Sequence, residues 1–332
     1  MSIFRTFLYL LSLGLVVACS EQHEQSTARY EHAAQGAFAS ALSHDGKYSL
    51  ISSIHHGVAL WDNQQHVLKY QWFQQQNQDS LVHTVAISYD NSHAVTAEKS
   101  TFAVWDIATG ENSGYYKIHA STIRDIAISN QGQSVLYGRA DGVVVYLNLE
   151  TGRRIEFLGH QEKVNVVDLS PNGHFAISGS NDYVAYFWDT RTGQVIHRFN
   201  HPTRVTQVAL DPQGRYAFTA DSMKQANVWQ LTTGDLVSKL QYIARQKIFT
   251  AARFNEEGSL IATGSPNRLV ELWQLNSGKK LQTWQVIPRE GSRPKSAVVL
   301  DVAFTDNSQA LLTESSSGFA ESFNLRESNE HN

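Results

Sequence analysis

The chain has a single cysteine, Cys19, in 332 residues, so it can form no internal disulfide. It also lacks an excess of basic residues, because Lys plus Arg number 27 against 31 for Asp plus Glu and the net charge is −4 at pH 7. Nucleic-acid-binding proteins usually present a basic surface, so no nucleic acid partner is expected. The remaining composition, 42% hydrophobic and 17% charged, is that of an ordinary folded protein.

Catalytic and cofactor motifs are missing as well. The sequence contains no Cys-X-X-Cys-His for haem, no Gly-X-Ser-X-Gly nucleophile elbow and no phosphate-binding loop. Of the 14 histidines, His55 and His56 could bind a metal weakly. Adjacent residues of a strand point to opposite sides, however, and no carboxylate or thiol lies nearby in sequence, so an ordinary surface loop is the favoured interpretation. We expect no metal, no cofactor and no enzymatic activity.

The N-terminus has the layout of a secretion signal. Arg5 is followed by the apolar stretch Phe7 to Ala18 and by small residues before the cysteine. Twelve residues are too few to span a bilayer, which takes about 20. The alternative, a buried N-terminal helix, is disfavoured by the polar segment that follows at residues 20–26. The pattern therefore predicts a signal peptide over residues 1–18.

Val16-Val17-Ala18-Cys19 resembles the bacterial lipobox, in which the cysteine is lipidated and becomes the mature N-terminus. This resemblance implies a membrane anchor on Cys19 and explains the lone thiol. In that pattern an Asp after the cysteine retains a lipoprotein at the inner membrane, whereas here the position holds Ser20. The resemblance thus implies an outer-membrane lipoprotein of a Gram-negative cell, facing the periplasm.

An internal repeat runs through the rest of the chain, and such periodicity decides the fold. Segments such as Val104-Trp105-Asp106 and Phe187-Trp188-Asp189 recur every 41 to 50 residues. The recurring aromatic position, or its substitute, is occupied by Trp61, Trp105, Leu147, Trp188, Trp229, Trp273 and Phe323. The sequence therefore contains seven units.

Each unit carries further markers. Turn stretches such as Ser170-Pro-Asn-Gly173 end 14 or 15 residues before the aromatic position, and their last residues suit a positive φ. Eleven residues after the aromatic position comes an expected buried anchor, at Trp72, Tyr116, Leu158, Phe199, Leu240 and Trp284. Short alternating or β-branched runs lie between the turns. Each unit is therefore predicted to be a four-stranded antiparallel blade.

Units of this length with Gly-His and Trp-Asp signatures resemble the WD40 repeat. The resemblance covers residues 27–328 and implies an all-β, seven-bladed β-propeller. In that family a His, a Ser, an Asp and a Trp form a buried hydrogen-bonded network, and in the fourth unit these are His160, Ser178, Asp182 and Trp188. The regular spacing of His119, His160 and His201 likewise makes them structural rather than catalytic.

The last unit ends too early to form its outermost strand, so residues 27–32 are expected to complete it and close the ring. Residues 19–26 would then be a tether from the lipidated cysteine. Its eight residues reach at most about 28 Å. Residues 329–332 form a polar tail.

One connection is unusually long. The segment Gln285 to Ser296 carries Arg289, Arg293 and Lys295, and Lys163 and Arg204 begin inner strands at equivalent positions. Long loops on a rigid scaffold often carry function, although a neutral insertion remains the alternative. We expect a monomeric scaffold that binds another envelope protein through this basic rim. A propeller enzyme, or a protein that binds a small ligand or metal in its central channel, is the competing hypothesis.

Overall fold

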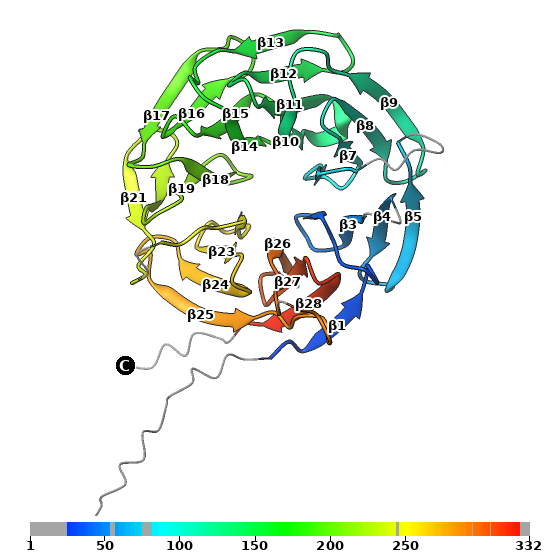
Figure 1. Cartoon of the computed structure of the whole chain (residues 1–332). Helices are drawn as coiled ribbons and strands as arrows, with labels where there is room; N and C mark the ends of the chain where they lie inside the picture. Colours follow the sequence, from blue (N-terminus) through cyan, green and yellow to red (C-terminus); the bar gives the residue numbers. More distant parts are fainter. Residues whose placement is uncertain are drawn as a thin grey trace, which may run out of the picture.

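The computed structural model describes residues 25–53, 57–74, 81–243, 246–293, 295–305 and 307–325. These residues form seven four-stranded antiparallel sheets arranged around a central axis (Figure 1). The predicted all-β, seven-bladed propeller is confirmed. No α-helix occurs in the described ranges, and one 3-10 turn, η1 (Asn130–Gly132), is the exception to pure β-structure there.

The blades share one order of strands from the axis outward. The innermost strands are β2 (Ala39–Leu42), β6 (Thr84–Ile87), β10 (Ile123–Ile128), β14 (Val164–Leu169), β18 (Val205–Leu210), β22 (Ala251–Phe254) and β26 (Val299–Thr305). The second strands are β3 (Tyr48–Ser53), β7 (His93–Ala97), β11 (Ser134–Arg139), β15 (Phe175–Ser180), β19 (Tyr216–Asp221), β23 (Leu260–Gly264) and β27 (Ala310–Ser315).

The outer half of each blade follows the same rule. The third strands are β4 (Gly57–Asp62), β8 (Thr101–Asp106), β12 (Val144–Asn148), β16 (Val184–Asp189), β20 (Ala226–Gln230), β24 (Leu269–Gln274) and β28 (Phe319–Asn324). The outermost strands are β5 (Val67–Trp72), β9 (Asn112–Lys117), β13 (Arg154–Phe157), β17 (Val195–Asn200), β21 (Leu236–Lys239), β25 (Lys280–Gln285) and β1 (Ala28–Glu31).

The seventh blade joins the two ends of the chain. Its outermost strand is β1, which pairs antiparallel with β28, and Ala28 lies opposite Ser322. The edge of β28 is therefore covered by a strand from nearly 300 residues earlier in the chain.

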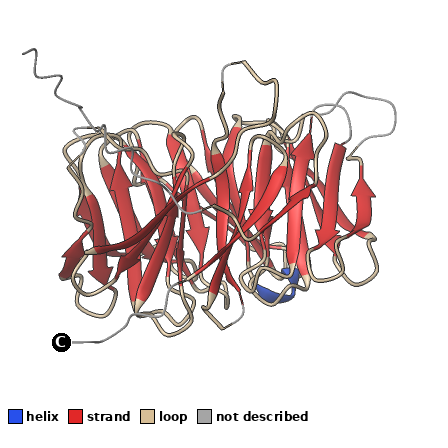
Figure 2. Ribbon diagram, turned by 90° about the horizontal axis from the view of Figure 1, so that it is seen from below, coloured by secondary structure: helices blue, strands red, loops and turns tan. Residues whose placement is uncertain are grey.

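The propeller has two faces. The upper face consists of the connections from each outermost strand to the next innermost strand, together with the turns between second and third strands. The lower face consists of the turns between first and second strands and between third and fourth strands. The η1 turn belongs to the lower face and marks it at the lower edge of Figure 2.

The turns between first and second strands agree with the predicted signature. The last residues of all seven predicted stretches have positive φ values: Gly46, Asn91, Gly132, Gly173, Gly214, Gly258 and Ser308. Positive φ is unfavourable for residues with a Cβ, so glycine is the common choice. The backbone of these tight turns therefore explains the composition of the repeat.

Burial changes from the inside of a blade to its outside. The second strand β11 is buried at every position, because neighbouring blades cover both faces of its sheet. The outermost strand β17 is mostly exposed and buries only Phe199. Continuous apolar runs thus mark the inner strands, and alternating polar runs mark the outer ones.

Adjacent blades are held together by stacked aromatic rings. Trp72 of the first blade stacks on Trp105 of the second, with ring centroids 4.9 Å apart. Phe199 of the fourth blade stacks on Trp229 of the fifth at 4.5 Å. The anchor that ends one unit therefore packs on the recurring aromatic residue of the next.

One predicted anchor is wrong. Leu158 is 68% exposed, and Phe157 takes its place by stacking on Trp188 at 4.7 Å. In five blades the pairing of third and fourth strands contains a one-residue register shift beside the aromatic position, whereas β12 and β13 pair without one. The anchor of the third blade therefore comes one residue earlier.

Candidate functional site

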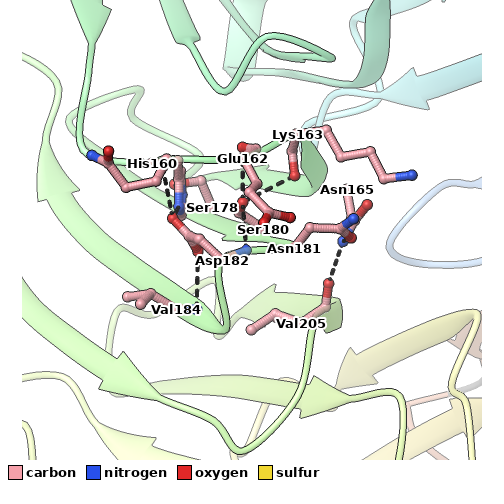
Figure 3. Close-up of polar contacts among 11 residues, drawn as sticks. His160, Glu162, Lys163, Asn165, Ser178, Ser180, Asn181, Asp182, Val184 and Val205 are labelled. Carbon is pink, nitrogen blue, oxygen red and sulfur yellow. Dashed lines mark hydrogen bonds and ion pairs between the residues drawn. The ribbon is translucent and has the colours of Figure 1, made fainter.

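The predicted polar network of the fourth blade is largely present (Figure 3). His160 Nδ1 lies 2.9 Å from Asp182 Oδ2, and His160 Nε2 lies 2.9 Å from Ser178 Oγ. Asp182 also accepts hydrogen bonds from the backbone N–H groups of Gln161 and Val184. Burial opposes ionisation of Asp182, but these hydrogen bonds prevail and hold the pKa of Asp182 below its usual value. The network therefore fixes the turn between β15 and β16.

Trp188 stands apart from this network. Its ring is buried against Phe157, but its indole nitrogen has no hydrogen-bond partner among the described residues. In the fifth and sixth blades the equivalent nitrogens, on Trp229 and Trp273, donate to threonine hydroxyls at 2.7 and 2.9 Å. Thr219 of the fifth blade contacts both Trp229 and His201, at 2.7 and 2.9 Å, whereas Ser178 contacts His160 alone.

The side chain of Arg289 forms contacts with other residues of the protein. Its Nη1 lies 2.7 Å from Glu31 Oε1, and its Nη2 donates to the carbonyl oxygens of Ala33 and Ser317 at 2.8 and 2.9 Å. The guanidinium also lies 4.7 Å from the centre of the Phe319 ring. Arg289 thus connects the long loop to both sides of the seam between β1 and β28.

The other predicted rim cations are exposed. Arg293 and Lys295 continue the same loop, and Lys163 and Arg204 precede β14 and β18 on the upper face. None of these four side chains forms an ion pair in the part of the chain that the structure describes. These four cations, rather than Arg289, are available to a partner.

Several predictions lie outside the described residues. Cys19 with its signal peptide, His55-His56 and the polar tail at 329–332 all belong to segments that the structure does not describe. Their roles stay predictions.

Exposed hydrophobic side chains are distributed unevenly between the two faces. Eight of them lie on the upper face: Phe38, Phe73, Leu81, Leu158, Tyr183, Met223, Ile243 and Ile287. The remaining eight lie on the outermost strands, and the described turns of the lower face contribute none. Exposed apolar side chains gathered on one face mark interaction surfaces, so the upper face is the candidate site.

The central channel forms a cavity with a volume of about 460 Å³. Its wall carries three aspartates and one arginine from the innermost strands: Asp125, Asp168, Asp301 and Arg253. Each aspartate accepts a hydrogen bond from a backbone N–H of the following blade. Asp125 accepts from Val167 at 2.9 Å, Asp168 from Leu210 at 2.7 Å and Asp301 from Leu42 at 2.8 Å.

These channel carboxylates thus hold neighbouring blades together. Burial raises the pKa of Asp125 and of Asp168 to about 6, against the stabilising effect of the backbone hydrogen bonds. Burial also raises the pKa of Asp301, which Arg253 contacts at 2.9 Å. These three carboxylates are therefore used in contacts between blades.

Side chains from opposite blades meet at the lower mouth of the channel. Glu256 accepts a hydrogen bond from the Tyr89 hydroxyl and lies 3.3 Å from His44 Nε2. Gln213 donates to the same carboxylate at 3.2 Å. Burial, followed by the charge of Arg253, lowers the pKa of His44 to about 4. Glu256 thus links turns of the first, second and fifth blades across the lower mouth.

Two structural features are absent from the described residues. No cluster of three or more His, Cys, Asp or Glu side chains suited to a metal occurs among the described residues. Within the same ranges, no helix has the length and apolar character needed to cross a membrane.

Comparison with known families adds one match. Residues 152–189 match the family model of the WD domain, G-beta repeat. Together, the seven blades and this match support a WD40-type propeller. The matched segment contains the His160 network. No curated protein matches the chain. Propellers of this type are typically protein-interaction scaffolds.

The sequence prediction missed some upper-face residues. Lys99, Arg124 and Tyr183 are exposed there, but they do not lie in the long loop that drew attention to Arg293. A signal for Tyr183 was present, because the equivalent position five residues before the aromatic one is glycine in the third and seventh units.

Proposed function

We propose that this protein is a non-catalytic interaction scaffold of the cell envelope, anchored to the outer membrane through lipid on Cys19. The observation that carries the scaffold role is the one-sided distribution of large exposed apolar side chains, which in the described residues all lie on the upper face or the outermost strands. The rigid ring would present that face to another envelope protein. The lipobox resemblance of Val16 to Cys19 supports the anchor. Stable anchoring takes two or more acyl chains.

The scaffold role is tested by partner capture from detergent-solubilised envelopes. One double variant, Leu158→Ser with Ile243→Ser, removes two apolar side chains from the upper face, where they are 68% and 99% exposed. Val67→Ser with Val195→Ser makes the same kind of change on outermost strands and serves as the control. We expect a defined protein to be retained by the control pair and lost with the upper-face pair. Equal retention by both pairs would refute docking through the upper face.

The anchor is tested separately. Growth with an alkyne-tagged fatty acid should label the natural chain, and Cys19→Ser should abolish the label and move the protein out of the membrane fraction. The same labelling in both forms would show that Cys19 is not the attachment point. Density separation of inner and outer membranes tests the location.

A further inference from the structure

The turn between β15 and β16 carries an unusual side chain. Tyr183 has a φ of 71° although it has a Cβ, and it is 53% exposed. The equivalent positions of the third and seventh blades are Gly142 and Gly318, with φ values of 89° and 80°. Positive φ for a bulky residue is a true outlier, and such strain often marks function. Burial of the ring does not compensate for it, so folding alone does not explain a tyrosine here.

Exposed cations lie beside this turn. The carbonyl oxygen of Lys163 accepts a hydrogen bond from the N–H of Asn181, two residues before Tyr183. Figure 3 shows the Lys163 side chain extending away from the His160 network. Asn165 of the same blade donates to the carbonyl of Val205 in the next blade at 2.8 Å, and Arg204 directly precedes Val205. Lys163 and Arg204 therefore occupy equivalent places in neighbouring blades.

The row of cations continues into the second and third blades. The N–H of Ile123 donates to the carbonyl of Lys99 at 2.8 Å, so Lys99 lies next to Arg124. Both cations are near His83, whose pKa is lowered by burial first and then further by their charges. Lys99, Arg124, Lys163 and Arg204, here called the basic arc, thus span four consecutive blades.

Two of the four acidic groups around the basic arc have an ionisable partner. Asp141 pairs with Arg139, and Asp182 pairs with His160. Glu98 accepts a hydrogen bond from the Thr101 hydroxyl. Glu98 and the exposed Glu162 are the carboxylates without an ion pair in the described part of the arc, and four cations outnumber them. The arc therefore keeps an excess of positive charge although the whole chain is negative.

We propose that the basic arc binds an extended acidic segment of a partner protein, with an apolar side chain of that segment packed on Tyr183. Packed sheets lie about 10 Å apart, and an extended chain advances about 3.3 Å per residue. A carboxylate at every third position would therefore meet one cation per blade. This inference rests on the proposed scaffold function and specifies the chemistry of its partner.

The experiment uses the full chain and a fluorescent twelve-residue peptide with glutamate at every third position and one central leucine. A peptide with glutamine in place of glutamate is the matched probe. Anisotropy should show binding of the glutamate peptide that weakens with added salt, because exposed charges are screened. Lys163→Glu with Arg204→Glu should weaken binding at least tenfold, or about 1.4 kcal/mol.

Two controls separate binding from folding. Lys239→Glu with Lys279→Glu makes the same change of net charge away from the arc, on β21 and on a lower-face turn, and should leave binding unchanged. Tyr183→Gly should weaken binding about fivefold without lowering the unfolding midpoint, since glycine relieves the positive φ. Arg268→Gly, at the equivalent turn of the sixth blade with a φ of 72°, should relieve the same strain and keep binding.

Three results would overturn the inference: equal binding by the arc and control variants, equal binding of the glutamine peptide, or full competition by a single-stranded DNA of the same charge. The last would indicate general polyanion binding. If the glutamate peptide does not bind, but the double variant Leu158→Ser with Ile243→Ser still fails to capture a partner that the control pair captures, the scaffold function stands. Only the proposed acidic chemistry of the partner is then wrong.

Discussion

Replacing Arg289 with alanine should destabilise the closing seam of the ring. The change leaves the carbonyl oxygens of Ala33 and Ser317 without the guanidinium, and both residues are buried. Each lost hydrogen bond to a charged donor is worth at least about 1 kcal/mol. Loss of the contact with the Phe319 ring adds about 0.5 kcal/mol.

The pair with the exposed Glu31 adds at most about 1 kcal/mol, because solvent screens it. The expected total for Arg289→Ala is therefore about 3 kcal/mol in the free energy of unfolding. Arg289→Lys keeps the charge but not the planar fork, so it should fall between the natural protein and the alanine variant. Urea unfolding measures the total, and hydrogen exchange of the amides in β1 shows whether the seam opens first.

Arg293→Ala is the matched control, because Arg293 lies in the same loop and is exposed. It should change the free energy of unfolding by less than about 0.5 kcal/mol. If Arg289→Ala behaves like this control and β1 exchanges no faster, the seam is held by strand pairing alone, and the reasoning from guanidinium contacts fails.

Three other predictions follow from the interior. Asp125→Asn should cost less than Asp168→Asn, because the introduced amide can donate to the Thr84 hydroxyl, whereas Asp168 has only backbone N–H partners and its replacement should cost about 1–3 kcal/mol; urea midpoints compare the two variants. The raised pKa values of Asp125 and Asp168, about 6 each, mean that the folded state keeps protons that the unfolded state releases above pH 4. Their contribution to the free energy of unfolding should therefore fall as pH rises from about 4 to 6 and stay constant above pH 6. Asp125→Asn should make the dependence of the free energy of unfolding on pH less steep. Lys247→Met should lower the free energy of unfolding by about 2–3 kcal/mol, because it removes a partner of the buried Glu271. Adding Glu271→Gln should recover part of that loss. If nothing is recovered, the lysine stabilises the protein through packing and not through the ion pair.

Repetition explains how much of the fold could be predicted. Seven copies of the same turn and the same aromatic position were enough to predict the blades, because every copy meets the same steric demands. The exception shows the limit: Leu158 and Phe157 are both apolar, and only the absence of a register shift between β12 and β13 decides which one is buried. A register shift of that kind leaves no mark in a single sequence.

The candidate site was less predictable, because it depends on which backbone groups lie within reach of a side chain. Arg289 and Arg293 look alike in the sequence, yet the first meets two carbonyl oxygens across the seam and the second meets solvent. The channel aspartates were missed for the same reason. Asp125 and Asp301 are the third residues of their strands whereas Asp168 is the fifth, so no single repeat position predicts that all three bind the next blade.

The closing seam and the basic arc lie on different sides of the ring, and this arrangement has a functional consequence. The seam belongs to the seventh blade, where β1 leads back toward residue 19, while the arc spans the second to fifth blades across the axis (Figure 1). A lipid on Cys19 would hold the protein by its seventh blade on a tether of about 28 Å at most. The arc would then lie on the side of the ring away from the anchored edge. Arg289 would secure the strand that bears the tether, and Lys163 with Arg204 would remain free for a partner.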